Sequence, residues 1–171
     1  EIIMGQSPAG KSYNKLGKGT PFFQGKKEFG KKYPAVEQWT TEPSKMAKPN
    51  DILISVRAPV GSINLTNIKC CIGRGLASIR CKNEINMEFV YFFLKIKEKE
   101  IENLGNGSTF KAITSKQLLD IKIPIPPLPL QQKFAKIVEH IEGLKEKINK
   151  TKQNSEELFN SLMKKAFRGE L

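Results

Sequence analysis

The sequence predicts an α+β protein in which a β-rich body with a few short helices precedes one long C-terminal coiled-coil helix. Three observations lead to this class. Short segments of alternating apolar residues, separated by glycine and proline turns, fill the first half of the chain. A proline-rich stretch, IPIPPLPL, follows at residues 123–130. Beyond it, apolar residues recur every three and four positions almost to the end of the chain.

The body begins with segments that predict short strands. Residues 5–34 are rich in glycine, lysine and aromatic residues, which predicts loops around one strand at residues 21–24. In DILISVRAPVG, every second residue is apolar (Ile52, Ile54, Val56), so we expect a strand that is buried on one face only. GSINL and CCIGRGLASIRC predict further short strands.

The second half of the body predicts helices and one more strand. A helix capped by Asn86 continues until Gly105 stops it. Thr114 or Ser115 then caps a short helix. Residues 121–125 alternate apolar and other residues, which predicts a strand, and the proline inside it predicts that this strand lies at a sheet edge.

The last segment predicts a helix of about 38 residues, roughly 57 Å long. The prolines before it favour an extended hinge and then a first helical turn. We therefore expect a body at residues 1–127 and a coiled-coil helix at residues 128–171. Packing of this helix back onto its own body is the alternative. The heptad positions are Phe134, Ile137, Ile141, Leu144, Ile148, Thr151, Ser155, Leu158 and Leu162.

Composition narrows the classes of function. The net charge is +12, and residues 1–129 carry most of it, with 20 basic and 11 acidic residues. A basic body indicates a polyanion partner, nucleic acid first and a membrane surface second, although a general solubility charge is the alternative. The sequence shows no apolar run of membrane-spanning length and no secretory signal, and it starts without methionine, so we expect a cytoplasmic protein or an excised piece of one.

Catalytic and metal-binding patterns are missing from the sequence. The three cysteines (Cys70, Cys71, Cys81) form no CxxC pair, and we expect buried thiols in a reducing compartment. His140 is the single histidine and falls on the predicted long helix. There is no GxxxxGK[ST] phosphate loop and no spaced acidic cluster. A binding module is therefore favoured over an enzyme that acts on nucleic acid.

Six stretches follow one another along the chain: GQSPAGKSYN, GTPFFQGKKEFG, DILISVRAPVGSINL, IGRGLASI, GSTFKAIT and IPIPPLPLQQ, the last followed by the heptad helix. Together they resemble the target recognition domain and spacer helix of the specificity subunit of type I DNA restriction–modification enzymes. Related domains occur in fused modification–specificity proteins of the type IIG kind. Each stretch alone is weak, but six in order over essentially the whole chain are a specific signal.

The resemblance implies separate roles for the recognition domain and for the helix. The recognition domain reads one half of a split double-stranded DNA target. The helix sets the spacing of the half-sites and docks the methyltransferase (modification) subunit, which carries the S-adenosylmethionine, and through it the restriction subunit. No cofactor is expected in this chain, and prokaryotic origin is implied. Only one body and one helix are present, so we expect either a half-length subunit or part of a longer or fused one, and a homodimer through antiparallel helices.

Contacts with DNA need basic side chains for phosphates and polar side chains for base edges. The glycine-rich loops and the arginines framed by glycine or proline are the candidates, with a solvated loop as the alternative for each. Arg57 and Arg74 lie in the stretches that carry the resemblance, so we expect them to hold phosphate or pair within the protein rather than read bases. The predicted DNA-binding residues are Lys11, Tyr13, Asn14, Lys15, Lys18, Gln24, Lys26, Lys27, Lys31, Arg57, Arg74, Ser108, Thr109 and Lys111.

A different class of function also fits the pattern. The helix would recruit a protein partner, and the basic body would be incidental, which makes the chain a coiled-coil interaction adaptor. The two hypotheses differ in one observable, because only the specificity module prefers one duplex sequence over others.

Overall fold

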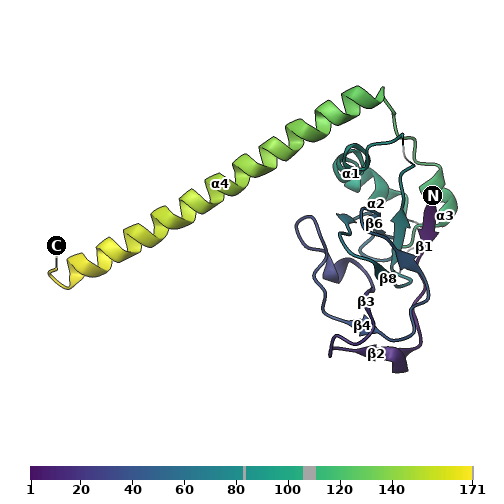
Figure 1. The fold of residues 1–171 in the computed structure, drawn as a ribbon, viewed down its shortest axis with the longest axis horizontal. Helices are drawn as coiled ribbons and strands as arrows, with labels where there is room; N and C mark the ends of the chain where they lie inside the picture. Colours follow the sequence, from purple (N-terminus) through teal and green to yellow (C-terminus); the bar gives the residue numbers. More distant parts are fainter. Residues whose placement is uncertain (83, 106–110, 171) are drawn as a thin grey trace. The chain divides into compact units, whose positions relative to one another are not determined.

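The chain forms an α+β fold with one long C-terminal helix, as predicted (Figure 1). A computed structural model describes residues 1–82, 84–105 and 111–170. These fall into two compact units, Glu1–Gln131 and Gln132–Leu171. The elements are β1 (Ile2–Met4), η1 (Gly10–Ser12), β2 (Tyr13–Asn14), β3 (Thr20–Phe23), η2 (Lys26–Glu28), β4 (Trp39–Thr40), β5 (Met46–Ala47), β6 (Ile52–Ser55), β7 (Ile63–Leu65), β8 (Cys70–Ile72), β9 (Leu76–Ile79), α1 (Met87–Ile96), α2 (Glu98–Asn103), α3 (Ser115–Leu119) and α4 (Leu128–Phe167).

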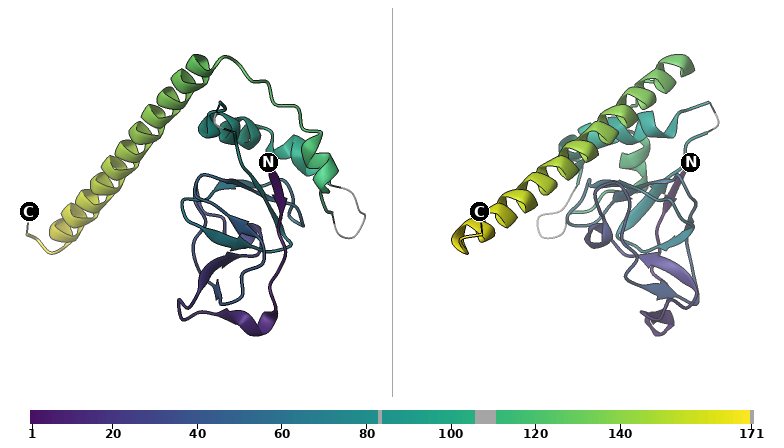
Figure 2. Two further views of the ribbon diagram at one scale, coloured as in Figure 1. Left: turned by 45° about the vertical axis from the view of Figure 1, so that its right-hand side comes forward. Right: turned by 60° about the vertical axis from the view of Figure 1, so that its left-hand side comes forward.

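Two sheets make up most of the first unit. One has four strands in the order β1-β9-β6-β7, and all its neighbours are antiparallel. The other has five strands in the order β2-β4-β3-β8-β5, and it is mixed because β3 runs parallel to β8. The helices α1, α2 and α3 lie toward one end of this unit, and β2 and β4 lie toward the other (Figures 1 and 2).

Strand β6 is buried on both faces, so the prediction of a half-buried strand was wrong. Ile52 and Ile54 pack into the cluster that includes residues of α1, α2 and α3, such as Leu94. Leu53, on the opposite face, packs against Phe23 and Cys70 of the second sheet. The four-stranded sheet thus lies between a helical layer and a second sheet, which alternation within one strand does not predict.

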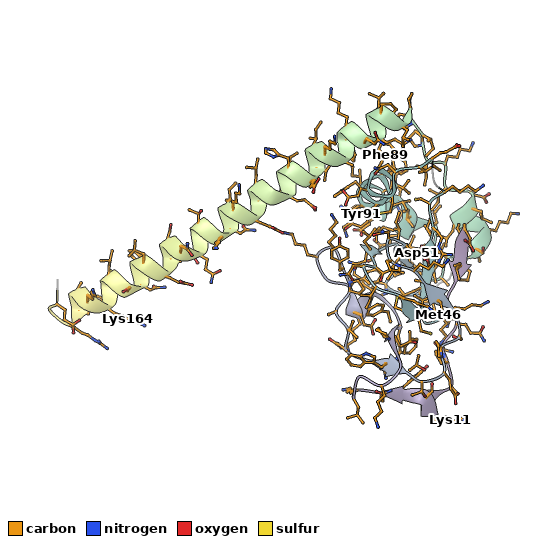
Figure 3. All side chains as sticks on the ribbon, in the orientation of Figure 1. Lys11, Met46, Asp51, Phe89, Tyr91 and Lys164 are labelled. Carbon is orange, nitrogen blue, oxygen red and sulfur yellow. The ribbon has the colours of Figure 1, made fainter. Side chains whose placement is uncertain are left out.

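A buried acidic residue anchors the start of β6 to β9. Asp51 is 2% exposed, and its carboxylate accepts hydrogen bonds from the Lys48 amide at 2.8 Å, Ser78 Oγ at 2.8 Å and Arg80 Nη2 at 2.7 Å. The bond to Asp51 raises the pKa of the Arg80 guanidinium. Figure 3 labels Asp51 inside the first unit, and removal of Arg80 would leave this buried carboxylate without its cationic partner.

The segment after Asn86 forms two helices, whereas the sequence predicted one. Asn86 caps α1 as predicted, because its side chain accepts the Phe89 amide at 3.0 Å. The chain leaves helical geometry at Lys97, which has φ −88° and ψ 5°. The carboxylate of Glu98 accepts the amide of Ile63 in β7 at 2.7 Å. We attribute the break to this tertiary bond, which ties the first residue of α2 to β7 and which an uninterrupted helical pattern in the sequence does not reveal.

The predicted strand at residues 121–125 does not form: the structure describes residues 121–127 throughout, and all lack strand pairing. Ile121 and Ile123 nevertheless pack against the core that contains α1 and α3. The alternating apolar residues therefore reflect packing against the core. No strand ladder forms, because the prolines in this segment have no N–H group to donate. The short helix before it, α3, is capped by Thr114, which accepts the Gln117 amide at 3.3 Å.

The first turn of α4 belongs to the first unit and is held there by Gln131. This side chain is 1% exposed. Its Nε2 donates to the carbonyl of Pro126 at 2.7 Å, and its Oε1 accepts the amide of Asn86 at 2.9 Å. One glutamine therefore joins the proline segment to the start of α1, a contact between positions 45 residues apart.

The second unit is the rest of α4. The helix has 40 residues, about 60 Å at 1.5 Å per residue. It ends in a Schellman motif, in which Gly169 adopts φ +71° and the Glu170 amide donates to the Lys165 carbonyl at 3.0 Å. Over the part of the chain that the structure describes, no helix has the length and apolar character needed to cross a membrane.

Candidate nucleic-acid interface

Six separate segments of the first unit meet around a hollow of about 680 Å³. The residues that surround it come from the N-terminal loop, the loop after β2, the end of β3 with η2, the loop before β4, the β6–β7 loop and the β8–β9 turn. They are Ser7, Lys15, Gln24, Gly25, Lys26, Lys27, Glu28, Glu37, Gln38, Arg57, Ala58, Pro59, Arg74 and Gly75. Five are basic and two are acidic, so the hollow is a cationic surface, named the basic cleft below.

Backbone hydrogen bonds bring these segments together. The Gly73 amide donates to the Phe23 carbonyl at 2.8 Å, which extends the parallel pairing of β3 and β8. The Val56 amide donates to the Gly75 carbonyl at 2.9 Å and so places the loop after β6 beside the β8–β9 turn. The Arg74 amide donates to Ser7 Oγ at 3.3 Å. Arg57 and Arg74, distant in sequence, therefore lie at one surface.

Position 75 needs glycine because the backbone of Gln24 lies very close to it. A Cβ at this position would lie 2.3 Å from the carbonyl oxygen of Gln24, closer than side-chain carbons approach backbone oxygen in proteins. The small residue lets the β8–β9 turn sit directly against the end of β3. The same contact holds Arg74 next to Gln24 along the wall of the basic cleft.

Most of the cations of the basic cleft are not neutralised by the protein. Arg57 and Arg74 are exposed. Among the residues that the structure describes, no carboxylate forms an ion pair with Lys15, Lys26, Arg57 or Arg74. Unpaired guanidinium and ammonium groups that converge on one surface attract an anion, and arginine adds a planar fork that matches phosphate.

The two acidic residues of the cleft have partners in the protein. Glu28 is 9% exposed and accepts the Gly25 amide at 3.0 Å, so it caps η2. Glu37 pairs with Lys27 Nζ at 3.3 Å, with both side chains more than half exposed. Exposed pairs of this kind contribute little to stability. Among the described residues, Lys27 is therefore the basic side chain of the cleft whose charge a carboxylate partly offsets.

Two glutamine side chains stand among these charges. Gln24 Nε2 donates to Gln38 Oε1 at 2.8 Å. Gln24 follows β3 and Gln38 precedes β4, so the bond joins the two strands just beyond their paired residues. Gln38 was missed by the sequence prediction, as were Ser7 and Glu37, because nothing local distinguishes them from solvated loop residues.

Other predicted contacts have roles inside the protein. Tyr13 Oη donates to the Pro8 carbonyl at 2.9 Å, and its ring lies 4.8 Å from that of Phe22. The side chain of Asn14 accepts the Lys18 amide at 3.0 Å and donates to the Lys18 carbonyl at 2.8 Å, so it organises the loop that follows β2. These bonds favour a structural role for Tyr13 and Asn14 over a contact with DNA.

The remaining predicted contacts lie apart from the basic cleft. Lys11 lies at the β2 end of the first unit (Figure 3), and Lys18, Lys31 and Lys111 are exposed but do not line the hollow. Ser108 and Thr109 lie outside the described residues. The structure thus brings together Lys15, Gln24, Lys26, Lys27, Arg57 and Arg74 from the predicted set.

A second hollow, of about 510 Å³, lies among α1, α2, α3 and residues 121–124. Its lining is mainly apolar, with Phe93, Ile101 and Leu104 prominent, so it lacks the chemistry of an anion site. In the described part of the chain, histidine, cysteine and acidic side chains form no group that could hold a metal ion. Cys70 and Cys71 are buried free thiols as predicted, whereas Cys81 is only half-buried.

The second unit carries an apolar stripe along α4. Ile137, Ile141, Leu144, Ile148, Leu158 and Leu162 are each 43–65% exposed within the single chain. Two polar residues interrupt the stripe. Thr151 Oγ1 donates to the Lys147 carbonyl at 3.0 Å, and Ser155 Oγ donates to the Thr151 carbonyl at 2.9 Å. Both hydroxyls are satisfied by the helix itself, which lowers the cost of burying them in an interface.

The chain matches one protein family over nearly its whole length. The profile of the type I restriction modification DNA specificity domain matches residues 1–157. A putative type I restriction enzyme MjaX specificity subunit of Methanocaldococcus jannaschii is 47% identical over 172 residues, which cover 100% of this chain and 40% of that protein. The MjaIX specificity subunit of the same organism is 30% identical over 105 residues, 60% of this chain and 24% of that protein.

Solved structures agree with this match. The HsdS subunit from Thermoanaerobacter tengcongensis superposes with a TM-score of 0.78 and 40% identity, over 100% of this chain and 43% of that one. A chain from a study of complex assembly and conformational transition of the type I R-M system gives 0.80 and 42%, over 100% and 44%. The chain therefore spans about two fifths of the length of the MjaX specificity subunit.

Proposed function

The chain belongs to the family of type I restriction–modification DNA specificity domains, and we propose that it recognises a double-stranded DNA sequence for such a system. Family membership supports DNA as the ligand. The relatives described as specificity subunits are longer than this chain, which covers 40% and 24% of two of them. The cytoplasm of a prokaryote is the proposed location.

The basic cleft is the observation that carries this proposal. It gathers Lys15, Lys26, Lys27, Arg57 and Arg74 on one surface of the first unit. A DNA backbone offers a line of phosphates that such cations neutralise, with release of counterions. Arg57 and Arg74 suit phosphate in particular, because both belong to the stretches that carry the family resemblance and shared positions hold the backbone rather than select the bases.

Each of the two parts of the chain has its own proposed role. Residues 1–127 read one half of a bipartite target, and residues 128–171 set the spacing of the half-sites and dock the methyltransferase subunit. S-adenosylmethionine is held by that subunit, which in turn brings the restriction subunit. This chain acts as the non-catalytic specificity component. The exposed apolar stripe of α4 supports a partner helix. Six large apolar residues along one face of a helix are expected to be covered by a partner rather than left in water.

We also propose that two copies pair through antiparallel α4 helices. A two-fold pair presents two identical copies of residues 1–127, called the heads. An inverted, split DNA site has the same two-fold symmetry. The self-bonded hydroxyls of Thr151 and Ser155 support burial of the whole stripe.

Duplex binding over a range of salt concentrations tests the proposal. The cleft variant carries Lys26→Gln, Arg57→Gln and Arg74→Gln. The matched control carries Lys133→Gln, Lys136→Gln and Lys145→Gln on α4, which removes the same charge from exposed positions. We expect the cleft variant to lose about tenfold or more in affinity and to show a shallower salt dependence, by about one unit of slope per lost contact. Equal losses in both variants would leave the interaction-adaptor hypothesis in place.

A further inference from the structure

The Gln24–Gln38 pair places two neutral side chains among the charges of the basic cleft. Neither residue caps a helix or belongs to a strand. Gln24 is exposed and Gln38 is half-buried. Their amides form one hydrogen bond with each other, 2.8 Å long. Within the part of the chain that the structure describes, the remaining carboxamide atoms of the two side chains have no other protein partner, so they face solvent at the cationic surface.

The single bond decides what the pair offers to a ligand. Because Gln24 Nε2 donates to Gln38 Oε1, Gln24 Oε1 remains as an acceptor and Gln38 Nε2 remains as a donor. If both amides are turned over, the roles are exchanged but the outcome is unchanged. In either case Gln38 keeps at least one N–H beside a free lone pair of its own carbonyl oxygen, and the mutual bond limits how the two side chains rotate.

One base edge complements this pattern. In the major groove adenine presents an acceptor, N7, beside a donor, the N6 amino group. Guanine presents two acceptors, cytosine presents a donor, and thymine presents an acceptor with a methyl group. A donor beside an acceptor therefore satisfies both adenine atoms and leaves one group unpaired against any other base, which discriminates strongly in a desolvated groove.

We propose that the Gln24–Gln38 pair reads an adenine in the major groove of the bound duplex. This inference rests on the proposed function, since it assigns a base to the same cleft. The surrounding cations hold the phosphates, and the neutral pair selects the base. Gln24 lies in a stretch that carries the family resemblance, whereas Gln38 lies outside all six stretches. Gln38 is therefore the residue that distinguishes this chain's target, and Gln24 positions it.

Selection from a random duplex library, read by sequencing, tests the assignment. The chain as it stands, Gln38→Glu and Gln132→Glu are compared. Gln132 makes the same chemical change at an exposed position on α4 outside the cleft. We expect the unaltered chain and Gln132→Glu to select one common motif. Gln38→Glu is expected to change a single adenine position of that motif, toward cytosine, because a carboxylate accepts from the cytosine N4 amino group.

A modified base at the adenine position found by selection provides a second readout, measured directly as binding. At the assigned position 7-deazaadenine lacks the N7 acceptor. We expect the unaltered chain to bind this duplex about tenfold more weakly and Gln38→Ala to bind both duplexes alike. A clear motif that is the same for Gln38→Glu at every position would overturn the inference and leave the proposed function standing. If the unaltered chain selects no motif at all, the proposed function itself fails.

Discussion

Arg57 and Arg74 differ from the other basic residues of the chain in how they are held. Both lie in turns fixed by hydrogen bonds from backbone amides: the Val56 amide donates to the Gly75 carbonyl, and the Arg74 amide donates to Ser7 Oγ. Their guanidinium groups are exposed at the basic cleft. Fixed turns reduce the conformational entropy that is lost when a side chain binds, so these two residues are expected to contribute more than lysines on looser loops.

Single substitutions separate cleft residues from other cations. We expect Arg57→Gln and Arg74→Gln each to weaken duplex binding several-fold and to lower the salt slope by about one. Lys111→Gln removes the same charge from an exposed residue that does not line the cleft, and it should change affinity less. Fluorescence anisotropy over a salt series measures both quantities, and an equal effect of Lys111→Gln would contradict the role of the cleft.

Cys70 gives the protein a pH dependence at the alkaline end. Burial raises the pKa of this thiol to about 12, against a smaller opposite effect of its hydrogen bond with Thr66. Below about pH 9 both the folded and the unfolded states hold the proton, and the residue has no effect on pH dependence. Above that value only the unfolded state ionises, so the free energy of unfolding falls as the pH rises toward 12.

We expect the free energy of unfolding to fall by about 1 kcal/mol more between pH 7 and pH 10 in the unaltered chain than in Cys70→Ala. Urea unfolding at the two pH values measures this difference, and other titrating groups cancel because both proteins contain them. An identical pH dependence in the two proteins would mean that the thiol ionises in the folded state as readily as in water.

At the level of elements, the start of α4 depends on a side chain from its own first turn. The side chain of Gln131 is almost fully buried. It donates to the Pro126 carbonyl and accepts from the Asn86 amide. The proline-rich segment provides few amides of its own, so a side chain takes over the bonding that a strand would otherwise supply. The proline segment is therefore held by one glutamine and by apolar packing.

Gln131→Ala tests this anchor. We expect a loss of about 1–3 kcal/mol in the free energy of unfolding, because the half-buried Asn86 amide and Pro126 carbonyl lose a fully buried partner. Gln132→Ala removes the same group from the next, exposed position and should have little effect. Thermal or urea unfolding gives both values, and similar losses would show that the buried bonds add nothing beyond helix propensity.

The stripe along α4 is the second element with a clear experimental consequence. Ile141→Asp with Leu144→Asp places two charges in the proposed seam, and we expect it to convert a dimer to a monomer. Lys136→Asp with Lys150→Asp puts the same residues at exposed positions off the stripe, and the dimer should persist. Light scattering measures the mass of each. A monomeric unaltered chain at tens of micromolar would exclude self-pairing and point to another subunit as the partner.

For the whole molecule, pairing and base reading together predict a bipartite target. Two heads joined by a rigid pair of helices bind two inverted half-sites with high effective concentration only when the half-sites have the right separation. We expect affinity to peak at one spacing, about 100-fold above a single half-site. The half-site from the selection experiment, placed in inverted pairs with varied separation, provides the probe.

The seam variant provides the control for this experiment. Ile141→Asp with Leu144→Asp should bind a single half-site as well as the unaltered chain does, but it should show no preferred spacing. A flat spacing profile for the unaltered chain, with normal binding to a single half-site, would refute the rigid pairing and leave the recognition by the head intact.

By itself the sequence determined the features that depend on near neighbours. The α4 helix follows from a local repeat of three and four residues, and its length, its apolar stripe and its end near Gly169 agree with that pattern. The short helix capped by Thr114 follows from an equally local bond. The six ordered stretches identified the family, and one of them contains Gly75, where the structure leaves no room for a Cβ atom.

Only the tertiary structure decided which residues share a surface. Gln38, Arg57 and Arg74 meet because β3 pairs in parallel with β8, a contact across some 50 residues that no local pattern specifies. The same long-range packing buried both faces of β6 and broke the helix after Ile96. A side chain's type is a property of the sequence, but the partner that competes for its hydrogen bonds is a property of the fold.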